Sequence, residues 1–165
     1  MAGIARGRLQ EERKAWRKDR PFGFTAKPRT NADGTQDILN WECAIPGKAG
    51  TIWEGGLFPL TMTFSADYPS EPPRCVFKKI DGKPLFHPNI YPSGRVCLSI
   101  INPANEHGTW RASLTMKQVL LAIQLLLDEP NQADPAQCDA WETLRRKPED
   151  YKRRVKEQVK RCPQF

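Results

Sequence analysis

Apolar residues recur at helical spacing near the start of the chain and then alternate with polar ones, which predicts a helix followed by strands. The predicted helix covers residues 3–19 and is ended by Pro21. Its expected buried side consists of Ile4, Leu9, Ala15 and Trp16. Strict alternation of apolar and polar residues at 39–45 and at 58–64 then predicts two strands, each with one buried face.

Two further segments complete a predicted sheet. Residues 74–78 are a third strand candidate, and residues 25–28 are a short edge strand. The turns between them are rich in Gly, Asn, Asp and Pro, and short connections between neighbours favour an antiparallel meander. Cys43 and Cys75 fall within strand patterns, so we expect both thiols to be buried and unreactive.

The C-terminal part of the chain predicts three helices. A capping box at 115–118 opens the first, and residues 116–127 are apolar nearly all round, so this helix should be fully buried. Asp134 is the expected N-cap of the second helix, with Pro135 at its first position. Residues 148–161 predict the third. A helix, a meander and then helices define an α+β fold.

Composition narrows the class of protein. The chain has 165 residues, 39% of them hydrophobic and 27% charged, which is typical of one globular domain over 1–165. We expect neither a membrane span of about 20 apolar residues nor a secretory signal. Five cysteines without Cys-x-x-Cys spacing and only two histidines disfavour disulfides and metal sites. We therefore expect no metal, no cofactor and a reducing compartment, the nucleus and cytoplasm.

The chain has a formal net charge of +7, and part of this excess of basic residues lies on the predicted first helix. Its basic residues recur at helical spacing and form a stripe of Arg6, Arg13, Arg17 and Arg20. Such a stripe is often only a solvated face. A basic surface can also bind nucleic acid, acidic membranes or acidic proteins. Because no nucleic-acid-binding motif accompanies the charge, we expect an acidic protein partner, with no membrane and no specific nucleic acid.

The candidate chemistry lies around Cys97. Residues 86–99 read Phe-His-Pro-Asn-Ile-Tyr-Pro-Ser-Gly-Arg-Val-Cys-Leu-Ser, and the prolines and the glycine disfavour regular structure. A thiol in a loop is accessible to a large partner. Asn89 supplies an amide that could stabilise an oxyanion or fix a turn. His87 permits a Cys-His hydrolase, although such an enzyme also needs a third residue to orient the histidine.

This window and several other segments resemble the ubiquitin-conjugating enzymes, in which His-Pro-Asn is followed by a cysteine and then a tryptophan, here Trp110. Within that family the chain is most similar to the SUMO-conjugating enzymes. The matching segments are 12–18, 21–24, 40–47, 53–58, 91–94, 96–100 and 134–137. The resemblance covers nearly the whole chain. It implies the family's α+β fold, with an N-terminal helix, a four-stranded antiparallel meander and three helices.

The resemblance also implies an acyl transferase of an ATP-dependent pathway. Cys97 would accept SUMO as a thioester from the SUMO-activating enzyme and pass it to substrate lysines, with SUMO ligases as further partners. Asn89 would stabilise the oxyanion, Asp134 would orient the lysine, Tyr91 would line the same groove, and His87 would be structural. Because a carboxylate raises the pKa of a nearby amine, we expect Asp134 to position the lysine rather than deprotonate it.

Binding surfaces follow from the same resemblance. The first helix would meet the activating enzyme, and the modifier would bind Arg13, Arg17 and Arg20. The hydrophobic residue and the lysine of a substrate would contact Asp134, Pro135, Ala136 and Gln137. An acidic residue of the substrate would be read by a surface at Arg74, Val76, Ser93 and Arg95. A basic residue is usual at 76 and a small hydroxyl residue at 95, so we hypothesise that Arg95 supplies the missing cation.

Two segments depart from the family pattern, and three alternatives stay open. Residues 78–84 and 101–109 are longer than usual and flank the active loop, which leaves substrate preference and ligase pairing open. A ubiquitin-class conjugating enzyme is the closest alternative; the basic first helix and the long 46–56 segment argue against it. An inactive binding module would not need Cys97. A Cys-His hydrolase would act without ATP.

Overall fold

The computed structural model describes residues 2–163 and confirms the predicted α+β order of elements. Within the described residues, the fold consists of four α-helices and four strands, with two short 3-10 helices between β4 and α2. Their bounds are α1 Ala2–Lys18, β1 Thr25–Thr30, β2 Gln36–Pro46, β3 Leu57–Thr63, β4 Arg74–Phe77, η1 Ser99–Ile101, η2 Ala104–Glu106, α2 Met116–Asp128, α3 Cys138–Arg146 and α4 Pro148–Lys160.

The strands form the predicted antiparallel meander in the order β1-β2-β3-β4. The register between β1 and β2 shifts once, and residues 38–40 are left without partners in β1. This bulge places Ile38 in the core, where its carbonyl accepts a 2.7 Å hydrogen bond from the indole of Trp41. Leu39, which the alternation predicted to be buried, is therefore only half-buried.

The first helix buries a different set of residues from the predicted one. The buried stripe is Ala5, Leu9, Glu12 and Trp16. Ile4 is 66% exposed and Ala15 is exposed, so these two predictions were wrong. The carboxylate of Glu12 accepts hydrogen bonds from the hydroxyl of Tyr68 and from the first N–H of α2. A buried acid is stable in the stripe because those donors satisfy it.

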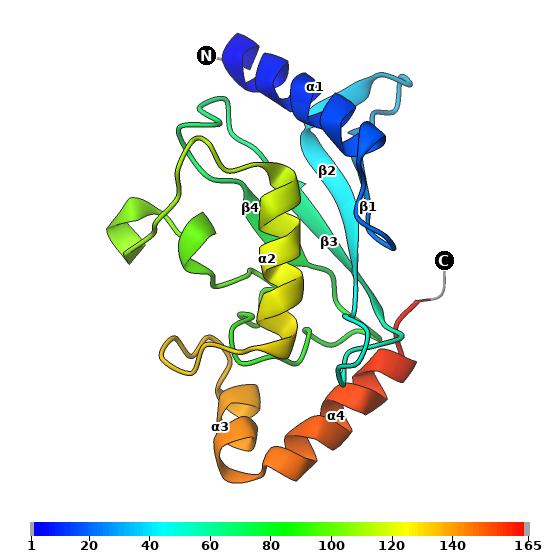
Figure 1. The fold of residues 1–165 in the computed structure, drawn as a ribbon, viewed down its shortest axis with the longest axis vertical. Helices are drawn as coiled ribbons and strands as arrows, with labels where there is room; N and C mark the ends of the chain where they lie inside the picture. Colours follow the sequence, from blue (N-terminus) through cyan, green and yellow to red (C-terminus); the bar gives the residue numbers. More distant parts are fainter. Residues whose placement is uncertain (1, 164–165) are drawn as a thin grey trace.

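The helix α2 lies over one face of the sheet (Figure 1). Its predicted capping box is present between Thr115 and Gln118. One face supplies the core residues Met116, Val119, Leu120, Ile123, Leu126 and Leu127. Leu121 and Leu125 are 38% and 45% exposed, so the prediction of a helix buried on every side was wrong. A single sheet can cover only one face of a helix.

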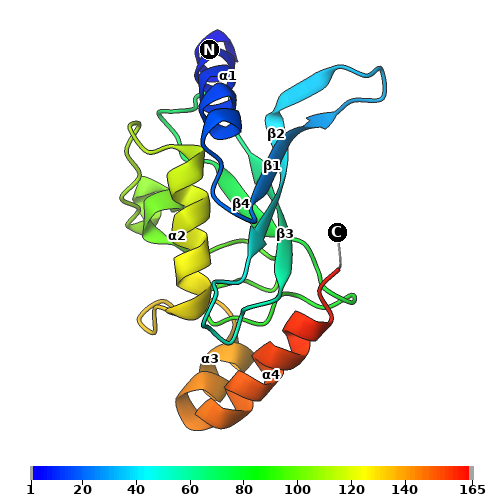
Figure 2. The ribbon, with the colours of Figure 1, turned by 45° about the vertical axis from the view of Figure 1, so that its right-hand side comes forward.

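The C-terminal helices α3 and α4 lie at the end of the molecule opposite α1 (Figures 1 and 2). The helix α4 agrees with the prediction, but α3 begins at Cys138 with Gln137 as its N-cap. Asp134 is therefore not a helix cap, and Pro135 lies before the helix. In the part of the chain that the structure describes, no helix is both long enough and apolar enough for a membrane span.

Candidate active site

Cys97 lies in a loop, as predicted, and the structure places this loop beside β4. The N–H of Phe77 in β4 donates to the carbonyl of Gly94 at 2.8 Å. A Cβ at Gly94 would lie 2.2 Å from the oxygen of Phe77, and the residue has φ +94°, so this close approach requires glycine. The N–H of Cys97 donates to the carbonyl of Asn89 at 2.9 Å. Cys97 is thus fixed against both β4 and the His-Pro-Asn segment.

The five cysteines differ sharply in exposure. Cys43, Cys75 and Cys162 are buried, and desolvation raises the pKa of each, that of Cys75 to about 12. The prediction that Cys43 and Cys75 are core residues is confirmed. Cys97 is half-exposed and Cys138 is exposed. These two thiols are the ones that another protein can reach.

Tyr91 lies next to Cys97, as expected of a residue that lines the groove. Interaction with the Cys97 side chain raises the pKa of the Tyr91 hydroxyl, and partial burial adds to this effect. The guanidinium of Arg95 lies 5.5 Å from the centre of the Tyr91 ring. Tyr91 therefore interacts with both Arg95 and Cys97.

Asn89 is fully buried and bonds a second segment of the chain. Its Nδ2 donates to the carbonyls of Asn131 at 2.7 Å and Asp134 at 2.8 Å, and its Oδ1 accepts from the N–H of Asn131 at 2.9 Å. The turn-fixing role that the sequence left open is thus observed. Both amide donors are occupied, so the oxyanion role stays a prediction that requires one donor to be released.

His87 has the structural environment expected for it. The ring is fully buried; Nε2 donates to the carbonyl of Leu126 at 2.9 Å, and Nδ1 accepts from the N–H of Asn89 at 3.0 Å. Desolvation lowers the pKa of His87 to about 4. Because both ring nitrogens are occupied, His87 cannot act as a base for Cys97, which argues against a Cys-His hydrolase.

Residues 131–137 are hydrogen-bonded to the His-Pro-Asn segment. The carbonyl of Pro88 accepts from the N–H groups of Ala136 at 2.8 Å and Gln137 at 3.3 Å. The amide of Gln137 donates to the carbonyls of Leu85 at 2.8 Å and Ile90 at 3.0 Å. The structure thus brings Asp134, Pro135, Ala136 and Gln137 to the active loop, as predicted, although the amide of Gln137 is occupied by the backbone.

Asp134 presents its carboxylate at the edge of this assembly. The side chain is exposed and accepts a hydrogen bond from Nδ2 of Asn131 at 2.9 Å. Its carbonyl is one of the two that bind Asn89. Asp134 therefore bonds the buried Asn89 amide through its backbone carbonyl and exposes its carboxylate to solvent. An incoming lysine amine can reach that carboxylate.

The predicted acid-reading residues also come together, with one addition. Arg95 pairs with Val76 in a β-bridge, and Arg74 and Arg95 line one cavity of about 650 Å³. Ser93 is exposed and accepts a 3.3 Å hydrogen bond from the N–H of Arg95. Glu106, which the sequence pattern did not single out, accepts a 2.7 Å bond from the Arg95 guanidinium through its carboxylate. The sequence feature that could have indicated Glu106 is that an acidic residue occurs in the long 101–109 segment.

The basic stripe lies elsewhere, on α1. Arg17 is exposed and Arg13 half-exposed, while Arg20 lies beyond the end of the helix at Lys18. Among residues 2–163, none of these three arginines has an ion-pair partner. The described residues also include no group of three or more His, Cys, Asp or Glu side chains placed to hold a metal ion.

An α+β fold with an accessible loop thiol beside a buried His-Pro-Asn segment defines a class, the thioester-forming conjugating enzymes. Comparison with known proteins agrees, since residues 8–159 match the family of ubiquitin-conjugating enzymes. The chain belongs to this family.

Three curated relatives are similar over nearly their full length. A SUMO-conjugating enzyme of Arabidopsis thaliana is 59% identical, over 98% of this chain and 97% of the relative. A SUMO-conjugating enzyme of Caenorhabditis elegans is 54% identical, over 96% of this chain and 92% of the relative. A SUMO-conjugating enzyme of Dictyostelium discoideum is 52% identical, over 99% of this chain and 98% of the relative.

Proposed function

We propose that this protein is a SUMO-conjugating enzyme, which accepts SUMO as a thioester on Cys97 and transfers it to substrate lysines. The observation that carries the proposal is the half-exposed Cys97 thiol, fixed by a backbone hydrogen bond to Asn89. The names of the three relatives supply the modifier. A ubiquitin-class enzyme is the less favoured alternative.

The chemistry needs an accessible sulfur more than a strong base. The Cys97 thiolate attacks the SUMO thioester of the activating enzyme, forms a new thioester and releases the thiol of that enzyme. A neutral substrate amine then attacks, and the oxyanion collapses to an isopeptide, with the amine proton lost and the Cys97 thiolate expelled. Because a thiolate leaves readily, no residue has to activate the sulfur for this second step.

Three neighbours are assigned roles in the second step. Asn89 donates to the oxyanion, which requires that one of its present bonds be exchanged. The exposed carboxylate of Asp134 orients the lysine. Tyr91, in contact with the sulfur, lines the groove through which the lysine approaches. These contacts support the assignment of Asn89, Asp134 and Tyr91 to discharge rather than to charging.

Partners and location follow from the same proposal. The partners are SUMO, the SUMO-activating enzyme, SUMO ligases and lysine-containing proteins, and the expected compartments are the nucleus and cytoplasm. The exposed arginines on α1 support a contact with acidic surfaces of SUMO. All five cysteines are free thiols, which suits a reducing compartment.

One gel tests the function. The protein is incubated with ATP, an activating enzyme and either SUMO or ubiquitin, and the products are run with and without reductant. We expect a SUMO adduct that reductant removes, in wild type and in the matched Cys138→Ser variant. An adduct formed with ubiquitin alone would favour the ubiquitin-class alternative, and cleavage of a modifier fusion without ATP would favour a hydrolase.

We further infer that Arg95 reads an acidic residue of the substrate, and that Glu106 competes for the same guanidinium. The Arg95–Glu106 pair is 2.7 Å long and partly exposed, so a substrate carboxylate can displace Glu106 at modest cost. The test is transfer to paired peptides that carry Glu or Gln at the acidic position. Wild type should prefer Glu, Arg95→Ala should lose most of that margin, and Glu106→Gln should widen it by about fivefold. An undiminished margin in Arg95→Ala would show that the acid is read elsewhere.

A further inference from the structure

Three side chains of α4 contact Phe86, the residue directly before His87. The ring of Tyr151 lies 5.6 Å from the Phe86 ring, and the guanidinium of Arg154 lies 4.0 Å from its centre. The amide of Gln158 bonds the Phe86 backbone twice, with Oε1 accepting from the N–H at 2.7 Å and Nε2 donating to the carbonyl at 3.3 Å. The start of the His-Pro-Asn segment is thus held through ring and backbone together.

These contacts come from one face of a single helix. Residues 151, 154 and 158 are spaced three and four apart, so they share a side of α4. Phe86 is only 8% exposed, and its backbone groups therefore depend on protein partners. Stacking on the ring restricts where Phe86 lies, whereas the two bonds from Gln158 also fix the rotation of the peptide groups on either side of it.

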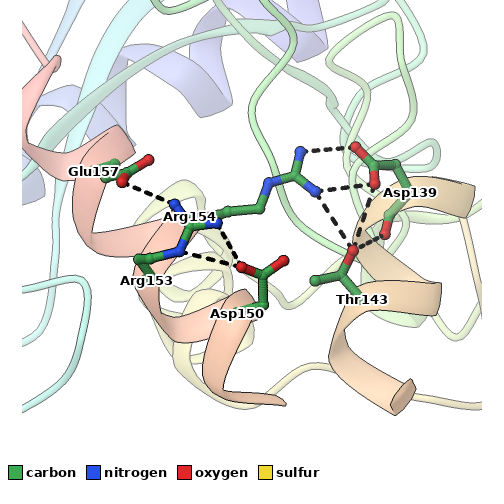
Figure 3. A network of polar contacts seen from close by, with 6 residues as sticks. All are labelled: Asp139, Thr143, Asp150, Arg153, Arg154 and Glu157. Carbon is green, nitrogen blue, oxygen red and sulfur yellow. Dashed lines mark hydrogen bonds and ion pairs between the residues drawn. The ribbon is translucent and has the colours of Figure 1, made fainter. Parts of the chain in front are cut away.

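The helix that carries Gln158 is itself fixed to α3. Arg154 bonds the carboxylate of Asp139 at 2.8 and 3.0 Å, and Figure 3 shows this contact beside the bonds that Arg153 makes within α4. The bond from Arg154 lowers the pKa of Asp139, so the carboxylate stays charged near neutral pH. The helix α3 directly follows residues 131–137, whose carbonyls bind Asn89.

The loop is therefore held at both ends. Gln158 fixes Phe86 at the beginning of residues 86–89, and the 131–137 segment fixes Asn89 at the end. The ion pair between α3 and α4 connects these two supports. A rotation at Phe86 would be transmitted through Pro88 to Asn89, whose carbonyl accepts the N–H of Cys97.

We propose that Gln158 is a positioning residue for the transfer of SUMO from Cys97 to lysine. This inference rests on the proposed function. Gln158 does not touch the reacting atoms; it acts through Phe86 on the orientation of residues 87–89 and hence on the sulfur and the Asn89 amide. Loss of that orientation slows amine attack, because reacting groups must meet at close range and in a defined geometry.

The test replaces Gln158 by Met, which keeps the length of the side chain and removes both hydrogen bonds. Glu157→Gln is the matched control, since it lies next to Gln158, neutralises the ion pair with Arg153 and leaves Phe86 untouched. Each protein is charged with SUMO and purified from activating enzyme. Discharge to free lysine is then followed over a range of lysine concentrations in a single turnover.

We expect the maximal discharge rate constant of Gln158→Met to fall by about ten- to a hundredfold, with the half-saturating lysine concentration unchanged. Glu157→Gln should discharge like wild type. Gln158→Glu, which keeps the acceptor for the Phe86 N–H, should lie between Gln158→Met and wild type. If Gln158→Met does not fold, the discharge rate constant of Gln158→Glu tests the inference in its place.

A merely structural role would give a different result. Unfolded protein does not become charged, so instability lowers the amount of thioester but not the rate constant of the molecules that carry it. An unchanged rate constant in Gln158→Met and Gln158→Glu would overturn the inference. Failure of the proposed function is distinguishable, because wild type itself would then form no reductant-sensitive SUMO adduct.

Discussion

The two sides of Cys97 are built by different interactions. On one side, the hydrogen-bonded side, Asn89 and residues 131–137 are joined by bonds to buried backbone and amide groups. On the other, the charged side, Arg74, Ser93, Arg95 and Glu106 lie at the surface around a partly exposed ion pair. Neutral bonds in the interior are insensitive to salt, whereas exposed ion pairs are screened and weak.

This difference assigns the transfer reaction to the hydrogen-bonded side and the recognition of the substrate to the charged side. The hydrogen-bonded side holds the groups assigned to lysine attack in one geometry. The charged side can exchange Glu106 for another carboxylate without moving that geometry, because the Arg95–Glu106 ion pair is partly exposed and weak. Changes on the first side should therefore alter rate constants, and changes on the second should alter the choice of substrate.

The largest expected effect is that of Asn89→Ala on discharge. If the amide donates to the oxyanion, its loss should slow transfer by about 2.7–4 kcal/mol, or several hundredfold, while charging is largely kept. If the amide only fixes the 131–134 carbonyls, the loss should be no greater than that of Gln158→Met. Single-turnover discharge of both variants decides between the two. Equal loss of charging and discharge would instead indicate misfolding.

The hydrogen-bonded side should also be sensitive to pH through His87. Its pKa is about 4 in the folded protein against 6.5 in the unfolded chain, so the unfolded state takes up a proton first as pH falls. Stability is therefore lost between pH 6.5 and 4, with the free energy of unfolding about 2 kcal/mol lower at pH 5 than at pH 7.5. Urea denaturation at the two pH values measures this loss.

The source of that pH dependence can be isolated, because the chain has two histidines. The variant His107→Gln leaves His87 as the one histidine, and its imidazole can then be followed by NMR. The signal should show no protonation between pH 7.5 and 5.5. A titration midpoint near 6.5 would mean that the ring is not buried as described.

Asp134→Ala separates the observed role of this residue from the predicted one. A lost helix cap would cost about 1 kcal/mol, but Asp134 caps no helix, so the free energy of unfolding should change by less than about 0.5 kcal/mol. Discharge to lysine should slow about tenfold through the lost contact with the amine. Thermal unfolding and single-turnover discharge report the two effects, and a destabilised variant with normal discharge would contradict the assignment.

An effect on binding rather than on chemistry is expected at the basic stripe on α1. Reversal of Arg13 and Arg17 to Glu should weaken non-covalent SUMO binding by about tenfold and reduce its dependence on salt. The matched control reverses Lys156 and Lys160 on α4, which changes the net charge equally at the other end of the molecule. Titration calorimetry at two salt concentrations measures both. If the two variants weakened SUMO binding equally, the binding would depend on the net charge of the protein and not on the position of the stripe.

The parts that the sequence could predict are those set by local pattern. Alternation located β2 and β3, and the capping box located the start of α2. Cys97 could be placed in a loop because Pro92 and Gly94 exclude regular structure around it. Resemblance to a family then supplied the roles of the site residues, which local pattern does not contain.

The parts that it could not predict depend on contacts between distant residues. Asp134-Pro135 has the local features of a helix start, but the carbonyl of Pro88 bonds the N–H groups of the two residues that follow and keeps them out of the helix. Glu12 can be buried because the Tyr68 hydroxyl, the Arg8 guanidinium and the N–H of Met116 all bond its carboxylate. Glu106 meets Arg95 because the long 101–109 segment lines the same cavity as the start of β4.

The central claim is that residue 97 carries the modifier. The most direct measurement charges Cys97→Ser with SUMO, isolates the adduct and locates the modified residue by peptide mass spectrometry. An ester of the serine oxygen resists thiols and is cleaved by alkali, so we expect a reductant-stable, alkali-labile adduct on residue 97. A reductant-sensitive adduct on Cys138 in this variant, and loss of charging in Cys138→Ser, would contradict the account.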